Sequence, residues 1–162
     1  MTANDVERRE LAEQLTAVGC GTVDLADIGP WISATFGRVA AVIGAQGAGP
    51  VGPPFARYFP AGTERFRVEA GFPASRRIDP TDDVEPSTLP AGPVAATTHI
   101  GSYDGVGEAY VRISAWAEEH GATTGTGPWE VYLTDPTSQP DPTTWRTDVF
   151  VPIEGVAARS TA

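Results

Sequence analysis

Glu130 and Tyr132 are the residues of this sequence whose types and spacing most favour a functional site. They lie within residues 127–136, where turn-forming pairs at both ends bound an aromatic and β-branched run that predicts a strand. Side chains alternate across a strand, so Glu130 and Tyr132 point to the same face. A carboxylate beside a phenol is unusual in the middle of a strand and predicts function here. The other face then receives Trp129, Val131 and Leu133.

Glu130 also has a purely structural interpretation. It could be an exposed strand residue that pairs with Arg57 or Arg146 across the sheet. If it is buried among aromatic rings instead, loss of hydration raises the pKa of its carboxyl, and a bound cation opposes that rise. Aromatic faces add about 0.5–2 kcal/mol for each contact with a cation. The sequence alone leaves both interpretations open.

The segment around Glu130 has an earlier counterpart. Tyr58 precedes Tyr132 by 74 positions, and the same offset relates Phe55 to Trp129 and Ala56 to Glu130. Further matches slip out of register by five positions after the loop at 134–144, which is longer in the second copy. Insertions belong in loops, so the pattern indicates an internal duplication in which only the second copy carries the acid.

Each copy is predicted to form a strand, a helix and two further strands. The first helix covers about residues 27–45 with Asp27 as N-cap, and the second covers about 104–120 and ends at Gly121. Strands at 55–59 and 66–72 join through a turn at 60–63, and a strand at 145–153 follows the Glu130 strand. The apolar helix faces are Ile32, Phe36, Val39 and Ile43 in the first copy, and Val106, Tyr110, Ile113 and Trp116 or Ala117 in the second.

The chain is therefore expected to form one α+β domain over residues 1–154. It consists of two βαββ repeats about a pseudo-twofold axis, with antiparallel sheets and one helix per repeat. The repeats cover about 4–73 and 93–154, and a proline-rich connection of about 74–92, part of which can pair at a sheet edge, joins them. Residues 155–162 form a frayed tail.

Composition narrows the possible partners. The 162 residues carry 21 acidic and 11 basic side chains, all of the latter arginine, for a net charge of −10. This balance argues against a nucleic-acid surface and is compatible with cationic ligands. Cys20 is the single cysteine and is expected to be a small buried side chain. His99 and His120 lie on different elements without further ligands at metal-binding spacing, so neither a metal nor a cofactor is expected.

Targeting signals are not evident in the sequence. The N-terminal segment is polar and charged through Glu13, unlike a signal peptide. No apolar run approaches the roughly 20 residues of a membrane helix. The expectation is a cytoplasmic protein without a membrane partner.

With its duplicated layout, the chain resembles the GyrI-like small-molecule-binding domain, which has the fold of the effector-binding domains of AraC-type and multidrug-sensing regulators. The specific matches are the start of the second helix, with His99, Gly101, Tyr103 and Asp104, and the strand with Glu130 and Tyr132. Two departures are Ser102, where the family usually has proline, and the lack of a helix-turn-helix segment.

The resemblance implies a pocket between the repeats that takes amphipathic, aromatic and often cationic molecules. Glu130 would be its central acid with Tyr132 beside it, and Phe55 and Tyr58 would contribute from the first copy. Trp31, Tyr103 and Trp129 are further candidate ligand-binding residues, although Trp31 and Tyr103 could equally serve packing or capping, and Trp129 could pack beneath the site.

Three functions are compatible with this resemblance. The first is binding of amphipathic small molecules, including sequestration of drugs or toxins. The second is a cofactor-free hydrolase that opens the cyclopropane of genotoxic natural products, with Glu130 activating water and Tyr132 assisting. The third is a protein-inhibitor module that docks on a larger enzyme, a partner for which the sequence gives no support of its own.

Overall fold

The computed structural model describes residues 5–135 and 138–155 and divides into two compact units. We call Ala12–Ala91 the N-terminal unit, and Met1–Leu11 together with Gly92–Ala162 the C-terminal unit. The helices are α1 (Ile28–Ala45) and α2 (Gly107–Glu119), and the strands are β1 (Glu7–Leu11), β2 (Gln14–Asp24), β3 (Phe55–Gly62), β4 (Arg65–Pro73), β5 (Val84–Leu89), β6 (Gly92–Ile100), β7 (Thr123–Thr124), β8 (Trp129–Tyr132) and β9 (Arg146–Glu154).

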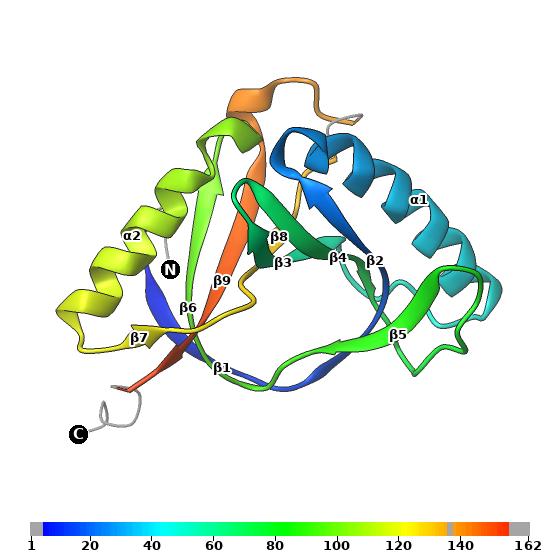
Figure 1. The fold of residues 1–162 in the computed structure, drawn as a ribbon, viewed down its shortest axis with the longest axis horizontal. Helices are drawn as coiled ribbons and strands as arrows, with labels where there is room; N and C mark the ends of the chain where they lie inside the picture. The colour runs from blue at the N-terminus through cyan, green and yellow to red at the C-terminus, as the bar shows by residue number, and fades with distance from the viewer. Residues whose placement is uncertain (1–4, 136–137, 156–162) are drawn as a thin grey trace. The chain divides into compact units, whose positions relative to one another are not determined.

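The N-terminal unit is an antiparallel sheet in the order β3-β4-β2-β5, with α1 packed along β2 and β4 (Figure 1). The buried side of α1 consists of Ile32, Thr35, Val39 and Ile43. Three of these are the predicted apolar positions. Phe36, the fourth, is half-buried and contacts Phe72 with 5.7 Å between ring centroids. The spacing of apolar residues therefore sets which side of α1 faces the sheet.

The C-terminal unit repeats this topology. Its antiparallel strands run in the order β8-β9-β6-β1, with β7 paired to the end of β9, and α2 packs along β6 and β9 (Figure 1). The core beneath α2 consists of Ala95, Ala109, Ile113, Val149, Val151 and Ile153. Two units with the same strand order and one helix each confirm the predicted α+β fold of two repeats.

β1 falls in the first predicted repeat but pairs in the C-terminal unit, whereas β5 confirms the expectation that part of the connection pairs at a sheet edge. After β1, residues 12–13 lead to β2, which belongs to the N-terminal unit. β1 pairs instead with β6, and β5, which lies in the predicted connection, pairs with β2. Each unit thus gains an edge strand from outside its own βαββ segment. The predicted tail from 156 onward lies outside the described residues, as does Pro136.

Two local expectations are corrected by the structure. β3 continues through Pro60 to Gly62 with a register shift, and the turn falls on Thr63 and Glu64, whose φ is 55°. Cys20 is exposed rather than buried, because β2 alternates and its side chain leaves the sheet on the side away from α1.

The stretch Leu25–Ala45 corrects a third expectation. Its 21 residues form a helix that is long and apolar enough to cross a bilayer, although the sequence was expected to contain no run of that length. The buried row along α1 packs against its own sheet in the N-terminal unit. We therefore describe this segment as a core helix of that unit.

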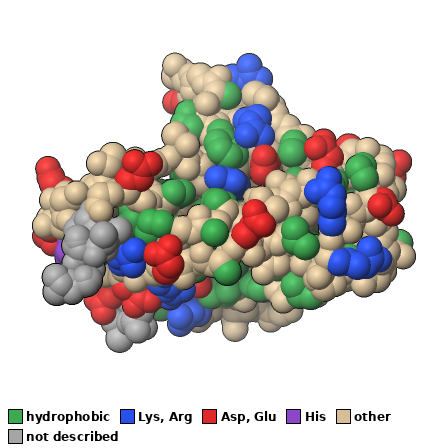
Figure 2. All heavy atoms as spheres, turned by 90° about the horizontal axis from the view of Figure 1, so that it is seen from below, with side chains coloured by type: hydrophobic (Ala, Val, Ile, Leu, Met, Phe, Trp, Pro, Cys, Tyr) green, Lys and Arg blue, Asp and Glu red, His purple; other side chains and the backbone are tan. Residues whose placement is uncertain are grey.

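Charged side chains of both signs are interleaved on the face shown in Figure 2. Arginines of the described residues form ion pairs with nearby carboxylates, such as Arg67 with Glu69 at 3.0 Å and Arg65 with Asp24 at 2.9 Å. The face in Figure 2 shows no continuous patch of positive charge.

Candidate functional site

Glu130 on β8 is a buried carboxylate held by two phenols. Only 8% of its surface is exposed. Tyr110 Oη on α2 donates a hydrogen bond of 2.7 Å to Glu130 Oε2, and Tyr132 Oη donates one of 2.9 Å to Glu130 Oε1. Both carboxylate oxygens are therefore paired with neutral donors, and the interpretation of Glu130 as an exposed residue is wrong.

Strand alternation explains part of this geometry. Glu130 and Tyr132 are two residues apart on β8, so they share a face, as the sequence predicts. Their cross-strand partners on β9 are Val149 and Thr147. The face that carries Glu130 is thus the one covered by α2.

Tyr110 is the partner that the sequence analysis placed only in the apolar face of the second helix. The helical spacing correctly orients its ring toward the sheet, with Ala109 and Ile113 buried beside it. Its hydroxyl then reaches the carboxylate of β8. The available signal is the duplication, because the matching position in the first copy is Phe36, which has the same ring without the hydroxyl.

Burial raises the pKa of the Glu130 carboxyl above its ordinary value. The hydrogen bonds from Tyr110 and Tyr132 and the nearby imidazole of His99 lower that pKa, but burial prevails. A proton or a cation near Glu130 relieves the cost of a buried negative charge. The site is therefore suited to receive positive charge, or to take a proton from a bound molecule.

Aromatic rings extend from Tyr132 toward the surface. The ring centroid of Tyr103 lies 5.6 Å from that of Tyr132, edge to face, and 4.9 Å from that of Trp145. Trp145 is fixed by a hydrogen bond of 2.7 Å from its Nε1 to the carbonyl oxygen of Gln139. Tyr103 is 36% exposed, so these rings lead from solvent to the buried carboxylate. Trp145 thus packs against Tyr103 in this cluster, a contact that the sequence does not predict.

His99 lies on the same face at the end of β6. Its Nε2 is 2.9 Å from the carbonyl oxygen of Ser102, and because a carbonyl only accepts, that nitrogen carries the proton. A Cβ atom on Gly105 would lie 3.0 Å from the imidazole Cε1. The turn at the start of α2 thus closes around His99 and fixes its ring near Glu130.

The N-terminal unit has apolar groups at the matching positions. Ala56 replaces Glu130 and is fully buried. On β4, Val68 pairs with Tyr58 on one side and with Gly21 on the other. Thr147 has the equivalent position on β9, where it pairs with Tyr132 and His99. The two units thus share a fold but differ in chemistry.

Trp31 fills the place that His99 has in the other unit. A Cβ atom on Gly21 would lie 2.8 Å from the indole Cζ2 of Trp31, so this ring lies directly on β2. In the N-terminal unit the Trp31 ring of α1 covers Gly21 on the strand, whereas in the C-terminal unit the strand itself carries the ring of His99, with Gly105 beside it. This half-buried tryptophan therefore packs on its own sheet.

Three of the remaining predicted ligand residues belong to the N-terminal unit, and Trp129 lies on the face of β8 opposite Glu130. Trp129 stacks on Phe150 at 5.5 Å on the opposite face of the sheet, where it supports β8 from behind. Phe55 is buried on β3, and Tyr58 packs edge to face on Phe66 at 6.1 Å. Contact of Phe55, Tyr58 and Trp31 with a ligand stays a prediction.

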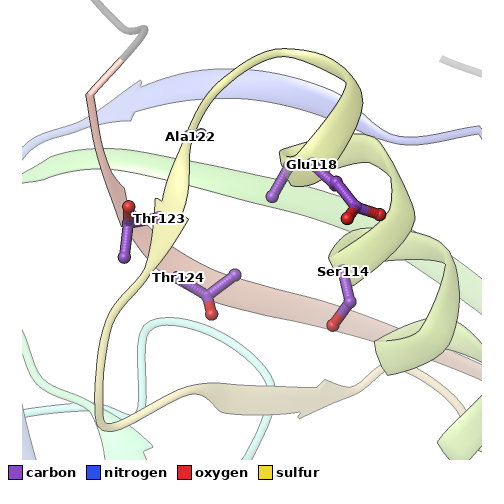
Figure 3. Close-up of a pocket in the computed structure, with 6 residues that line it drawn as sticks. Ser114, Glu118, Ala122, Thr123 and Thr124 are labelled. Carbon is purple, nitrogen blue, oxygen red and sulfur yellow. The ribbon is translucent and has the colours of Figure 1, made fainter.

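A shallow depression of about 430 Å³ lies between α2 and β7, and Glu130 is not among the residues that line it (Figure 3). Its lining is Ser114, Ala117, Glu118, Ala122, Thr123 and Thr124. These residues include no aromatic ring and no buried charge, whereas the Glu130 cluster has both. We therefore place the candidate site at Glu130.

Metal ligation is not supported within residues 5–135 and 138–155. They contain no group of three or more His, Cys, Asp or Glu side chains that could hold a metal ion.

Comparisons with known proteins identify the family of this chain. The family profile described as "GyrI-like small molecule binding domain" matches residues 4–154. A comparison with curated proteins finds no match.

Solved structures share the fold. The C-terminal domain of EcmrR has a TM-score of 0.75 at 20% identity, covering 93% of this chain and 97% of that one. In the EcmrR–DNA complex the chain spans only 57% of the EcmrR chain. SAV2435 bound to tetraphenylphosphonium has a TM-score of 0.67 at 14% identity, covering 98% and 99%. A hydrolase encoded by lin2189 from Listeria innocua has a TM-score of 0.70 at 13% identity, covering 94% and 93%.

At these identities the neighbours show the fold alone, while the profile match spans nearly the whole sequence. The His99 turn and the Glu130 strand both lie within the matched residues. This chain belongs to the family of GyrI-like small-molecule-binding domains.

Proposed function

We propose that this protein binds amphipathic aromatic cations at the Glu130 site and serves to sequester such molecules. The observation that carries the proposal is the buried carboxylate of Glu130, whose hydrogen-bond partners are two neutral phenols. A buried anion without a cationic partner is costly, and a ligand cation can supply the missing charge.

The aromatic rings near Glu130 support the class of ligand. The ring of Tyr103 contacts both Tyr132, at 5.6 Å between centroids, and Trp145, at 4.9 Å. Ring faces attract cations and pack against flat apolar groups. SAV2435, which shares this fold, was solved with tetraphenylphosphonium, a cation enclosed by phenyl rings.

The test compares two probes of similar shape and different charge. Tetraphenylphosphonium and neutral triphenylphosphine oxide are titrated into the wild-type protein and into Glu130→Gln by calorimetry. We expect the substitution to weaken the cation about tenfold or more, since each tenfold change corresponds to about 1.4 kcal/mol, and to leave the neutral probe within about twofold. Equal effects on both probes would contradict a role for the charge.

Hydrolysis is the second candidate function. The observation that favours it is the raised pKa of Glu130, which suits a general base better than an exposed carboxylate does. In this reaction Glu130 takes a proton from water, the oxygen bonds to a cyclopropane carbon, and the broken carbon–carbon bond leaves its electron pair on a conjugated acceptor, which then gains the proton. Tyr132 would assist through its bond to the carboxylate.

Mass spectrometry separates the two functions. The protein is incubated with a cyclopropane-bearing alkylator, and the product is examined for the addition of one water molecule. Turnover that Glu130→Gln abolishes would establish the hydrolase, whereas unchanged alkylator together with cation binding would leave the binding function alone.

A further inference from the structure

Thr147 on β9 has an unexplained hydroxyl. The residue is fully buried, and its Oγ1 finds no hydrogen-bond partner within residues 5–135 and 138–155. Buried hydroxyls are nearly always paired with protein groups or with ordered water. The side chain therefore requires an explanation beyond strand propensity.

The sheet register places Thr147 beside Glu130. Thr147 pairs with Tyr132 on β8 and with His99 on β6. Val149, two residues further along β9, pairs with Glu130. Residues that are directly opposite in a sheet share a face, so the unpartnered hydroxyl lies on the face that carries the buried carboxylate.

The polar side chains next to Thr147 donate their hydrogen bonds to groups other than its hydroxyl. Tyr132 Oη donates to Glu130 Oε1 at 2.9 Å, and the proton on His99 Nε2 goes to the carbonyl oxygen of Ser102 at 2.9 Å. Neither bond involves Thr147 Oγ1. A molecule that is not part of the chain is the natural partner for this oxygen.

The N-terminal unit shows that the fold does not need a hydroxyl here. Val68 has the same two-sided strand pairing, with Tyr58 and Gly21 as its partners. Valine has nearly the shape of threonine, so packing alone is satisfied without the oxygen. The hydroxyl occurs in the unit that also has Glu130 and His99 and is absent from the equivalent position in the unit that has Ala56 and Gly21.

We propose that Thr147 Oγ1 forms a subsite for one oxygen atom next to the Glu130 carboxyl. In the free protein the oxygen is that of a water molecule, and in a complex it is a hydroxyl or carbonyl oxygen of the aromatic ligand. The ligand half of this inference rests on the proposed binding function. The water half does not.

The first arm of the test is crystallographic. Ligand-free wild type and Thr147→Val are solved at a resolution that places waters. We expect an ordered water within about 3.2 Å of Thr147 Oγ1, its loss in the isosteric valine variant, and its return in Thr147→Ser. A dry Oγ1, or one bonded to a protein carbonyl, would overturn the subsite.

The second arm distinguishes ligand oxygen from water. Tetraphenylphosphonium and (4-hydroxyphenyl)triphenylphosphonium are titrated into wild type, Thr147→Val and Thr147→Ser by calorimetry. We expect Thr147→Val to weaken the hydroxylated cation about fivefold to tenfold, as for loss of one neutral hydrogen bond, and to change the parent cation less than about twofold. Thr147→Ser restores the preference.

Thr16 supplies a matched control. It is buried on β2 in the N-terminal unit, and its Oγ1 also has no partner within the described residues. Thr16→Val should leave both affinities unchanged, so an equal loss in this variant would assign the effect to stability and overturn the inference.

The remaining outcomes are also decisive. An ordered water at Thr147 without any preference for the hydroxylated cation supports the water half and overturns the ligand half. If the parent cation fails to bind wild type, the proposed binding function is wrong, while the crystallographic arm still decides whether the water subsite exists.

Discussion

Tyr110 Oη on α2 lies 2.7 Å from Glu130 Oε2 on β8, so a single hydrogen bond joins the helix to the buried carboxylate. The second phenol, Tyr132, comes from the same strand as the acid. The carboxylate is thus fixed from two directions, and its charge depends on both tyrosines.

Replacement of Tyr110 by phenylalanine should destabilise the folded protein at neutral pH. The ring still packs beneath α2, but the carboxylate loses one of its donors, and hydrogen bonds to charged groups contribute about 1.5–3 kcal/mol. Urea unfolding followed by circular dichroism measures the change. Val111→Ala, at an exposed position of the same helix, serves as control, and equal stabilities of wild type and Tyr110→Phe would contradict the assigned bond.

Glu130→Gln should stabilise the protein in the neutral range. Burial raises the folded-state pKa of Glu130 above the value of 4.5 of an ordinary glutamate, so between the two pKa values the folded state binds more protons than the unfolded chain. The free energy of unfolding therefore falls as the pH rises through that interval. Glutamine avoids this loss and still pairs with both phenols.

The measurement for Glu130→Gln is a series of urea titrations across pH. The difference between variant and wild type should grow from near zero below the ordinary glutamate pKa to a constant value above the raised one. A difference that is independent of pH would mean that Glu130 titrates normally in the folded state.

Two glycines of the N-terminal unit should respond in opposite directions to alanine. At Gly21 the new Cβ would lie 2.8 Å from the Trp31 ring, so the indole must move, and overpacking of this kind costs about 1–3 kcal/mol. At Gly37, inside α1, nothing lies within 4 Å, and alanine should stabilise by about 0.5–1 kcal/mol. Thermal unfolding and tryptophan fluorescence test both, and an unshifted emission for Gly21→Ala would contradict the packing of Trp31.

Cys20 should react slowly in spite of its exposure. Although the residue is exposed, partial desolvation of its thiol, together with the charges of Glu69 and Glu85, raises its pKa from 9.0 to about 11, against the opposing effect of Arg67. The thiolate is the reactive form and its fraction at pH 8 falls about a hundredfold, but a thiolate of higher pKa is also more nucleophilic, so alkylation should be about tenfold slower than for an unperturbed thiol. Iodoacetamide labelling measures the rate. Glu69→Gln should accelerate it, and an ordinary rate in wild type would contradict the raised pKa.

Much of the fold follows from local patterns in the sequence. The spacing of Ile32, Val39 and Ile43 predicts the buried side of α1, and strand alternation predicts that Glu130 and Tyr132 share a face. Such patterns can be read from the sequence because each depends only on a few neighbouring residues and on the repeat of a helix or a strand.

Long-range pairing was harder to predict. The charged strand β1 pairs with β6, about 90 residues away in sequence, and nothing in its own pattern specifies that partner. Tyr110 counts as apolar in a helical period, so its hydroxyl bond to Glu130 becomes visible only once α2 and β8 are placed. The packing of Trp145 on Tyr103 likewise becomes visible only once the segments before β9 and α2 are placed.

The pH dependence of tetraphenylphosphonium binding tests most directly whether Glu130 is the anionic group that receives the ligand. Affinities are measured by calorimetry from about pH 5 to about pH 9 for wild type and Glu130→Gln. We predict that the wild-type affinity rises about tenfold as Glu130 ionises, at a pH above the ordinary glutamate value because its pKa is raised, while the variant stays at the acidic level throughout. A wild-type affinity that does not change with pH, or a variant that binds the cation as well as wild type at high pH, would contradict this account.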